Sequence, residues 1–497
     1  MILLLVLLSF SIFFLFNLLK HKNISKKTAL LPPGPKGLPL IGNLHEFDPD
    51  HPHWWLHDLA KKYGPLMSMK LGSRRTIVVS SARVAKLALK DNDLALSGRP
   101  QLTALTKLTY NGSDITVSPY NESWRELRKI GLLHLFSVKQ VASLRPIRNH
   151  EVSCMIEDMI KKSKSNELIN LSSAAFSLSN GVICRAGFGR KYDGEGKRRF
   201  DELFKKIQEM LAGFFVGDYF PSLSWIDKLS GMDSKLNKVF RDLDMFIQEL
   251  INDHLDPKRP ESMNGDILDL LLRLKHDQAA SVGWNNVKGI LIDIFVAGTD
   301  TSAVVIAWAM TAMMRTPHTM KKAQEEVRNV VGNKGTVDEG DIQNLPYLKA
   351  IIKETLRLFP PAPLSVPRET IEKCTIDGYE IPPKTLVYVS AYAIGLDPEY
   401  WENPTEFIPE RFLDSTIDYR GHDFGLLPFG SGRRGCPGIN LGIAVVELAL
   451  ANLLYSFDWE LPHGMKNEDI DMEALPGINS SKKIDLCLVG KRYVYGN

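Results

Sequence analysis

A single cysteine near the C-terminus stands in a glycine-rich stretch that leads into an apolar run typical of a helix. The stretch covers residues 428–438 and reads Pro-Phe-Gly-Ser-Gly-Arg-Arg-Gly-Cys-Pro-Gly, with the cysteine at Cys436. A helix that starts after Pro437 directs backbone N–H groups and its positive dipole end at the sulfur, which favours the thiolate. A thiolate on a haem iron promotes O–O bond cleavage more than an imidazole ligand does. The loop therefore predicts that Cys436 is a metal ligand; the alternative is a buried structural cysteine.

The remaining residues of this loop suit a flat macrocycle bound beside the sulfur. Phe429 can shield the sulfur from water, and Arg434 carries a fork of donors that matches a carboxylate such as a haem propionate. A tight backbone path and a close approach of the cofactor both need glycines. The loop provides them at Gly430, Gly432, Gly435 and Gly438.

A second motif lies within the longest apolar helical run, which covers residues 284–315. It reads Ala-Gly-Thr-Asp-Thr from Ala297 to Thr301. Gly298 removes side-chain bulk where oxygen has to sit, and Thr301 can hydrogen-bond the carbonyl of Ala297, which loosens the helix locally. A threonine hydroxyl beside an acid, here Thr301 beside Asp300, can relay protons. We therefore predict an oxygen-activation site at this turn; the alternative is an irregularity in a packed helix.

Together the two motifs resemble those of the cytochrome P450 superfamily. Every fixed position of its haem-loop signature, Phe-x-x-Gly-x-Arg-x-Cys-x-Gly, is filled between Phe429 and Gly438, and residues 297–301 match its distal-helix motif. The similarity covers residues 32–497. It implies a mainly α fold with small β-sheets (α+β), the cytochrome P450 fold, with an N-terminal transmembrane anchor helix and haem b (iron protoporphyrin IX) as cofactor. A closer similarity to plant-type microsomal members of specialised metabolism is carried by residues 32–43, 118–125 and 366–369.

The resemblance also assigns roles to residues outside the two motifs. Glu354 and Arg357 can pair on one helix face, and the family places such a pair with Arg411 in a buried ion triad behind the haem loop. Contacts to the haem propionates are implied for Trp124, Arg128, Arg368 and Arg434. The substrate pocket is implied to include Ile115, Ala297, Thr299, Leu364, Ser365, Val366 and Asn479. Most of the pocket is apolar, so a lipophilic small molecule is expected as substrate.

The elements that must position these residues are mostly helices. The chain of 497 residues has no obvious internal linker, which predicts one large catalytic domain. Hydrophobic periodicity predicts helices near 120–134, 139–162, 198–212, 236–254, 284–315, 317–331, 347–358 and 441–456. Short β-branched runs predict strands at 66–71, 76–80, 365–368 and 385–390.

The N-terminus differs in kind from the rest of the chain. Residues 1–19 are almost wholly apolar and, at ~1.5 Å per helical residue, nearly span the ~30 Å hydrocarbon layer of a membrane. Lysines follow this run, which disfavours a cleaved signal peptide and places the body in the cytosol. We predict a membrane anchor at 1–19, a basic and proline-rich hinge at 20–39 and a catalytic domain at 40–497. This indicates a single-pass protein of the endoplasmic reticulum membrane whose catalytic domain faces the cytosol.

Charge and cysteine usage narrow the partners. A net charge of +3 is too small to suggest nucleic acid, and five widely spread cysteines suit a reducing compartment. The expected partners are the bilayer, a lipophilic substrate and, by resemblance, NADPH–cytochrome P450 reductase. This acidic flavoprotein could dock on a basic face formed by Arg125, Lys129 and Arg433.

The predicted function is that of a haem-thiolate monooxygenase, an oxidoreductase that uses molecular oxygen to oxidise a lipophilic specialised metabolite. Electrons come from NADPH indirectly, through the reductase, and the outcome is hydroxylation, oxidative coupling or desaturation. Two alternatives are a haem-thiolate isomerase or dehydratase that needs no external electrons, and a membrane-tethered haem protein that binds without turnover. Thr301 and Asp300 argue against both, because neither needs a proton-delivery motif.

Overall fold

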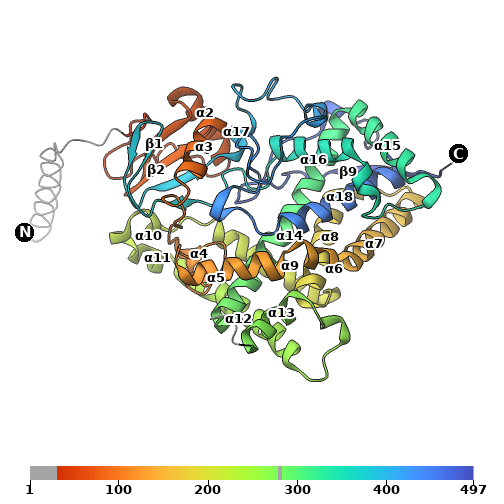
Figure 1. Cartoon of the computed structure of the whole chain (residues 1–497), viewed down its shortest axis with the longest axis horizontal. Coiled ribbons are helices and arrows are strands. Elements are labelled where there is room, and N and C mark those ends of the chain that lie inside the picture. Colours follow the sequence, from red (N-terminus) through yellow and green to blue (C-terminus); the bar gives the residue numbers. More distant parts are fainter. Residues whose placement is uncertain (1–30, 278–281, 496–497) are drawn as a thin grey trace, which may run out of the picture.

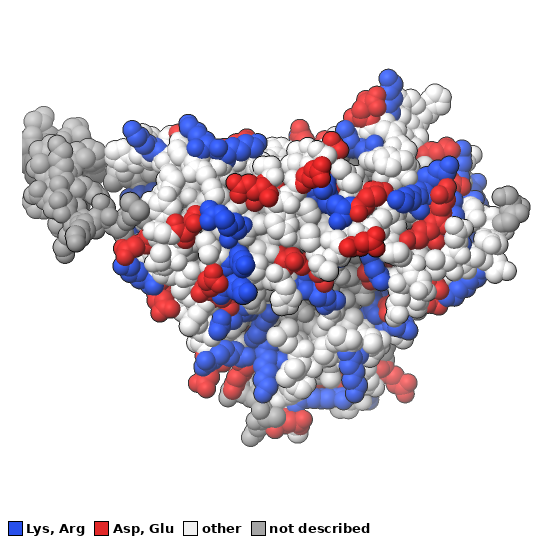
Figure 2. Space-filling model, turned by 45° about the horizontal axis from the view of Figure 1, so that its top comes forward, with Lys and Arg blue, Asp and Glu red and all other residues white. Residues whose placement is uncertain are grey.

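Helices dominate this computed structural model, which describes residues 31–277 and 282–495. The largest sheet lies on one side of the molecule, and the long helices fill the other (Figure 1). This arrangement confirms the predicted mainly α fold with small β-sheets. The predicted anchor at 1–19 and the first part of the hinge lie outside the described residues. On the face shown in Figure 2, acidic and basic side chains are interspersed, in keeping with the small net charge.

The largest sheet has four strands in the order β1-β2-β7-β4. β1 (Leu66–Leu71) and β2 (Arg74–Val79) form the predicted antiparallel hairpin. β7 (Leu386–Val389) runs parallel to β2, and β4 (Arg368–Glu369) pairs antiparallel with β7. Arg368 is thereby fixed at the edge of this sheet. The smaller sheets contain β3 (Ile169–Asn170), β5 (Cys374–Ile376), β6 (Tyr379–Ile381), β8 (Phe457–Glu460) and β9 (Cys487–Arg492).

Two long apolar helices, α14 (Trp284–Arg315) and α18 (Ile439–Ser456), form the centre of the fold. By length and mean hydropathy, 1.8 and 1.6, each could cross a membrane, but 67% and 72% of their most apolar windows are buried inside the protein. α14 packs along α8 (Leu171–Phe188) and also contacts α18. Both are therefore core helices of the catalytic body, since an all-apolar helix needs burial on every side.

The helix predicted at 139–162 is divided in two. α6 (Val138–Ser143) ends before Leu144, and α7 (Arg145–Lys164) begins with Pro146 in its first turn. Proline has no N–H for a continuous helical hydrogen-bond ladder but fits a first turn, which explains the break. The other α-helices are α2 (Pro52–Tyr63), α3 (Ala82–Lys86), α4 (Thr103–Leu108), α5 (Glu122–Ile130), α9 (Gly194–Leu211), α10 (Val216–Tyr219), α11 (Trp225–Leu229), α12 (Met232–Leu255), α13 (Ile267–His276), α15 (Pro317–Val331), α16 (Pro346–Leu358) and α17 (Ala391–Gly395).

Candidate active site

The cysteine loop folds back on itself just before α18. The Cys436 N–H donates to the carbonyl of Phe429 at 2.8 Å, and Gly430 and Gly432 have left-handed φ angles of 67° and 65°. A residue with a Cβ would be strained at both positions. α18 begins directly after Gly438, so its N-terminal end faces the sulfur. Burial raises the pKa of the Cys436 thiol and the Gly438 N–H opposes this, whereas ligation to a metal removes the thiol proton outright.

Asp93, which lies far from the cysteine loop in the sequence, holds this loop through hydrogen bonds. Its Oδ2 accepts hydrogen bonds from the backbone N–H of Arg433 at 3.2 Å and from the Arg433 Nη1 at 2.7 Å. Its Oδ1 accepts a hydrogen bond from Arg368 Nη1 at 3.4 Å. Gly432 lies tightly against the same carboxylate, since a Cβ there would be 2.5 Å from Oδ1. The loop geometry thus depends on a carboxylate 340 positions earlier in the chain, which the sequence motifs did not indicate.

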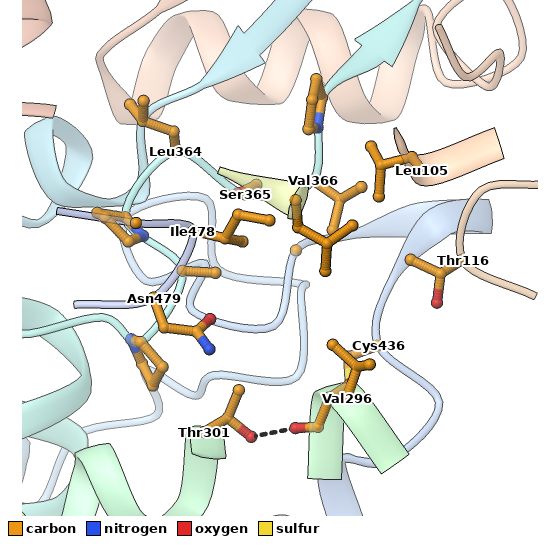
Figure 3. A pocket seen from close by; sticks show the side chains of 18 of the residues that line it. Leu105, Thr116, Val296, Thr301, Leu364, Ser365, Val366, Cys436, Ile478 and Asn479 are labelled. Carbon is orange, nitrogen blue, oxygen red and sulfur yellow. Dashed lines mark hydrogen bonds between the residues drawn. The ribbon is translucent and has the colours of Figure 1, made fainter. Parts of the chain in front are cut away.

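Cys436 lies in the wall of a cavity of about 1000 Å³. The residue is exposed although it lies deep in the fold, so its exposure is to the cavity and not to bulk solvent. Figure 3 shows Cys436, Val296 of α14, Thr301, Val366 and Ile478 around the open space. The volume lies at the upper end of the range for small-molecule sites, which is enough for a macrocycle and a substrate together.

Four arginines line this cavity: Arg99, Arg128, Arg368 and Arg434. Burial lowers the pKa of each guanidinium, and repulsion from neighbouring arginines lowers those of Arg99 and Arg434 further, the latter to about 9. So much buried positive charge fits an anionic ligand, and the two propionates of haem b supply two carboxylates. The residues therefore fit the predicted cofactor. Arg99 is an addition that the sequence reasoning missed.

Trp124 lines the cavity, but its single donor is already used. Its Nε1–H donates to the carbonyl of Ile115 at 2.9 Å, and the guanidinium of Arg434 lies 4.1 Å from the centre of its ring. Asp293 of α14 accepts the Ile115 N–H at 2.8 Å. In this structure, Trp124 and Asp293 therefore hold the loop that carries Ile115, and Trp124 does not present the free propionate donor that was predicted.

The motif in α14 places one hydroxyl at the cavity. The Thr301 Oγ1–H donates to the carbonyl of Ala297 at 2.8 Å, and both residues line the cavity (Figure 3). Gly298 also lines the cavity. A Cβ at Gly298 would lie 2.5 Å from Cδ1 of Ile183, so the missing side chain also lets α14 approach α8 closely.

Two residues of the same motif turn away from the cavity. Thr299 is fully buried and donates its Oγ1–H to the carbonyl of Phe295 at 2.6 Å, so it does not belong to the pocket wall as predicted. It lies about 200° around the helix axis from Ala297, which explains the difference. Asp300 also lies outside the cavity lining and accepts a hydrogen bond from Asn479 Nδ2 at 2.8 Å. Burial raises the pKa of Asp300, and the hydrogen bond from Asn479 opposes this rise.

Glu354 and Arg357 of α16 form an ion pair whose side chains are both 0% exposed. Two parallel hydrogen bonds of 2.7 Å join the guanidinium to the carboxylate. Arg411 donates its Nε–H to the same carboxylate at 3.1 Å, so the three residues meet as a triad. Arg357 donates further to the backbone carbonyls of Gly395, Pro404 and Glu406. The triad ties α16 to the segment that follows α17 and precedes the cysteine loop.

The remaining residues predicted for the substrate pocket all line the cavity. They are Ile115, Ala297, Leu364, Ser365, Val366 and Asn479. Leu105, Thr116 and Val296, which lie in segments expected to line the pocket but were not named individually, also face the open space (Figure 3). Leu105 lies in α4 and Thr116 lies between α4 and α5, where little in the sequence marks which side chains point inward.

Comparisons with known proteins agree with this geometry. The cytochrome P450 family model matches residues 32–488. The chain belongs to the cytochrome P450 family. It is 48% identical to strychnine-11-hydroxylase of Strychnos nux-vomica over 96% of this chain and 94% of the relative. It is 47% identical to 6,7,8-trihydroxycoumarin synthase of Pastinaca sativa over 99% and 98% of the two chains. A solved structure of a zebrafish cytochrome P450 shares the fold, with a TM-score of 0.75 and 23% identity over 89% of this chain and 100% of the other.

This P450 is accordingly a haem-thiolate monooxygenase of the plant specialised-metabolism type. Its cofactor is haem b, and its electrons come ultimately from NADPH through a redox partner. Haem ligated by a cysteine thiolate supplies the activation of molecular oxygen. The protein associates with membranes and acts on a lipophilic small molecule, as its plant relatives indicate.

Proposed function

We propose that this P450 hydroxylates a ring system in a lipophilic metabolite that binds above Cys436. Oxidative coupling or desaturation are the other outcomes open to the same site. The observation that carries the proposal is the largely apolar cavity with the thiol of Cys436 and the hydroxyl of Thr301 in its walls. Two relatives are named for hydroxylation of strychnine and for synthesis of a trihydroxycoumarin, which supports hydroxylation of a ring.

The proposal includes a place in the cell and an electron donor. Residues 1–19 anchor the protein in the endoplasmic reticulum membrane, 20–39 form the hinge, and 40–497 form the catalytic domain on the cytosolic side. NADPH–cytochrome P450 reductase in the same membrane supplies the electrons. The lysines that follow the apolar run support this orientation.

Exposed apolar side chains support contact between the catalytic domain and the membrane. They are Leu38, Leu40, Phe214, Trp225 and Leu229, which are 49–79% exposed. The first two side chains belong to the N-terminal segment and the other three to the region around α10 and α11. The turn between β1 and β2 joins these two segments, because the Gly72 N–H donates to the carbonyl of Ile41 and the Ser73 N–H donates to the carbonyl of Tyr219. The cavity also extends to Tyr219. A lipophilic ligand could therefore enter the cavity from the bilayer on this side.

The outer face of α5 offers a docking site for the reductase. Trp124 and Arg128 line the cavity, whereas Arg125 and Lys129, one helical turn apart, are exposed. Arg433 of the cysteine loop is a third exposed cation, with 46% of its side chain accessible. Charge on this face would steer an acidic reductase toward the haem.

A double substitution, Arg125→Glu with Lys129→Glu, tests this docking face. We expect reduction by the reductase and NADPH to slow by about tenfold at low ionic strength, because steering charges act mainly on association. The readout is the rate at which the carbon monoxide complex forms, which needs no substrate. Lys205→Glu with Lys206→Glu on α9 is the matched control. An equal loss in the control, or no loss in the α5 variant, would contradict the docking site.

A Thr301→Ala variant tests the proton relay. Without this hydroxyl at the cavity, we expect product formation to fall by about 10²-fold. NADPH consumption should continue, with more of its electrons recovered as hydrogen peroxide. The measurement is the ratio of peroxide to NADPH used, and Thr301→Ser, which keeps a hydroxyl, should restore coupling. An unchanged ratio in Thr301→Ala would show that Thr301 delivers no proton.

A further inference from the structure

The turn that carries Asn479 is held tightly by its neighbour Ser480. The Ser480 N–H donates to the carbonyl of Pro361 at 2.9 Å, and its Oγ–H donates to that of Pro360 at 2.8 Å. The Ser480 carbonyl accepts the indole N–H of Trp308 at 2.7 Å. Three hydrogen bonds to one buried residue fix the backbone on both sides of it. Asn479 therefore projects from a well-anchored position.

The side-chain amide of Asn479 has a defined orientation. Its Nδ2 donates to Asp300 Oδ2 at 2.8 Å, and the Oγ of Ser481 lies 3.5 Å from both carboxylate oxygens. When Asp300 is ionised, its carboxylate only accepts hydrogen bonds, so the amide nitrogen faces Asp300 and the amide oxygen faces elsewhere. The hydrogen bond to Asp300 therefore leaves the amide oxygen of Asn479, Oδ1, available to a ligand.

The amide oxygen of Asn479, Oδ1, belongs to a residue of the cavity wall. Asn479 lines the cavity, and Figure 3 shows its side chain pointing into the open space above Thr301. Within residues 31–277 and 282–495, no side-chain hydrogen bond involves Asn479 Oδ1. The hydroxyl side chains labelled on the wall, Thr116, Ser365 and Thr301, can rotate to donate or accept. The amide oxygen can only accept.

We propose that Asn479 is a specificity-determining residue whose Oδ1 accepts a hydrogen bond from a hydroxyl or N–H group of the substrate. Asp300 fixes the amide in this orientation, and the same amide positions the Asp300 carboxyl. The inference rests on the proposed function, because it concerns the substrate of that reaction. It narrows the substrate class to lipophilic molecules that carry a hydrogen-bond donor, and it disfavours analogues in which the donor is methylated.

The test is a spectral titration of the holoenzyme with two matched pairs of probes. The pairs are 2-naphthol with 2-methoxynaphthalene, and indole with 1-methylindole. The wild type should bind 2-naphthol and indole, which carry a hydrogen-bond donor, about five- to tenfold more tightly than their methylated partners, the usual effect of one hydrogen bond. Asn479→Leu should lose this preference. Ile478→Ala, a change at a cavity-lining neighbour in the same turn, should keep it.

A second variant guards against disruption of the turn. Asn479→Asp keeps an acceptor oxygen and should keep the preference for donors, whereas its peroxide yield should change because the two neighbouring carboxyl groups share a proton and Asp300 loses the amide donor. Equal responses of the wild type to both members of each pair would overturn the proposal, as would an unchanged preference in Asn479→Leu. The titration needs neither reductase nor turnover, so its failure would leave the proposed monooxygenation standing. Absence of NADPH-dependent product with a normal binding preference would instead count against the proposed function.

Discussion

An Arg357→Ala variant should lose about 3–5 kcal/mol of unfolding free energy and fail to accumulate as haem-loaded protein. The substitution leaves the Glu354 carboxylate at 0% exposure with two partners among the described residues, the Arg411 guanidinium and the Ile408 N–H. Three backbone carbonyls also lose their guanidinium donor. Unpaired buried groups cost far more than a lost surface contact. Chemical denaturation and the haem content of the purified protein measure the effect.

An exposed arginine provides the matched control for this prediction. Arg420 is 53% exposed and pairs with Asp418 at 3.3 Å, so Arg420→Ala should cost less than about 1 kcal/mol. Arg357→Lys should not restore stability, because one ammonium group cannot replace the two parallel hydrogen bonds of the guanidinium. A stable, haem-loaded Arg357→Ala protein would show that the triad does not support the haem loop.

A Cys436→Ser variant should lose all NADPH-dependent oxidation while the protein still folds. The side chain faces the cavity, so a change at Sγ leaves the core packing in place. The hydroxyl of serine is not ionised near neutral pH and cannot replace a thiolate ligand that favours O–O cleavage. The reduced carbon monoxide complex should lack the red-shifted absorption band of thiolate ligation.

Cys154→Ser on α7 is the control for the thiol chemistry, since that residue is half-buried and lies outside the cavity lining. This control should keep the thiolate band and its activity. Thiolate-type absorption in the Cys436→Ser protein would contradict the assignment of Cys436 as the metal ligand.

Short-range sequence patterns were sufficient to predict features that depend on residues close together in the chain. The apolar run of α14 was predicted at 284–315, and the helix has these bounds because Gly283 precedes it and Pro317 follows its C-cap, Thr316. For the triad, the local pattern indicated only the Glu354–Arg357 pair, whose members lie three residues apart, and the family resemblance added Arg411. α8 was missed, because its residues include many serines and small side chains without a clear apolar stripe.

Contacts between distant segments could not be read from the sequence. Asp93 and Arg99 reach the cysteine loop and the cavity from a region with no motif, and only the fold brings them there. The side chains of Thr299 and Trp124 were placed on the correct segments, but the direction or the hydrogen-bond partner differed from the prediction. Spacing along the chain identifies candidate residues, whereas packing decides which groups remain free for a ligand.

The most direct test of the account uses membranes that contain the full chain and the reductase. They are supplied with NADPH, heavy-isotope oxygen gas and an extract of lipophilic plant metabolites, and the products are analysed by mass spectrometry. We predict a new product that carries one heavy oxygen atom and forms only when NADPH is present. A product that forms without NADPH and carries no label would contradict the monooxygenase assignment.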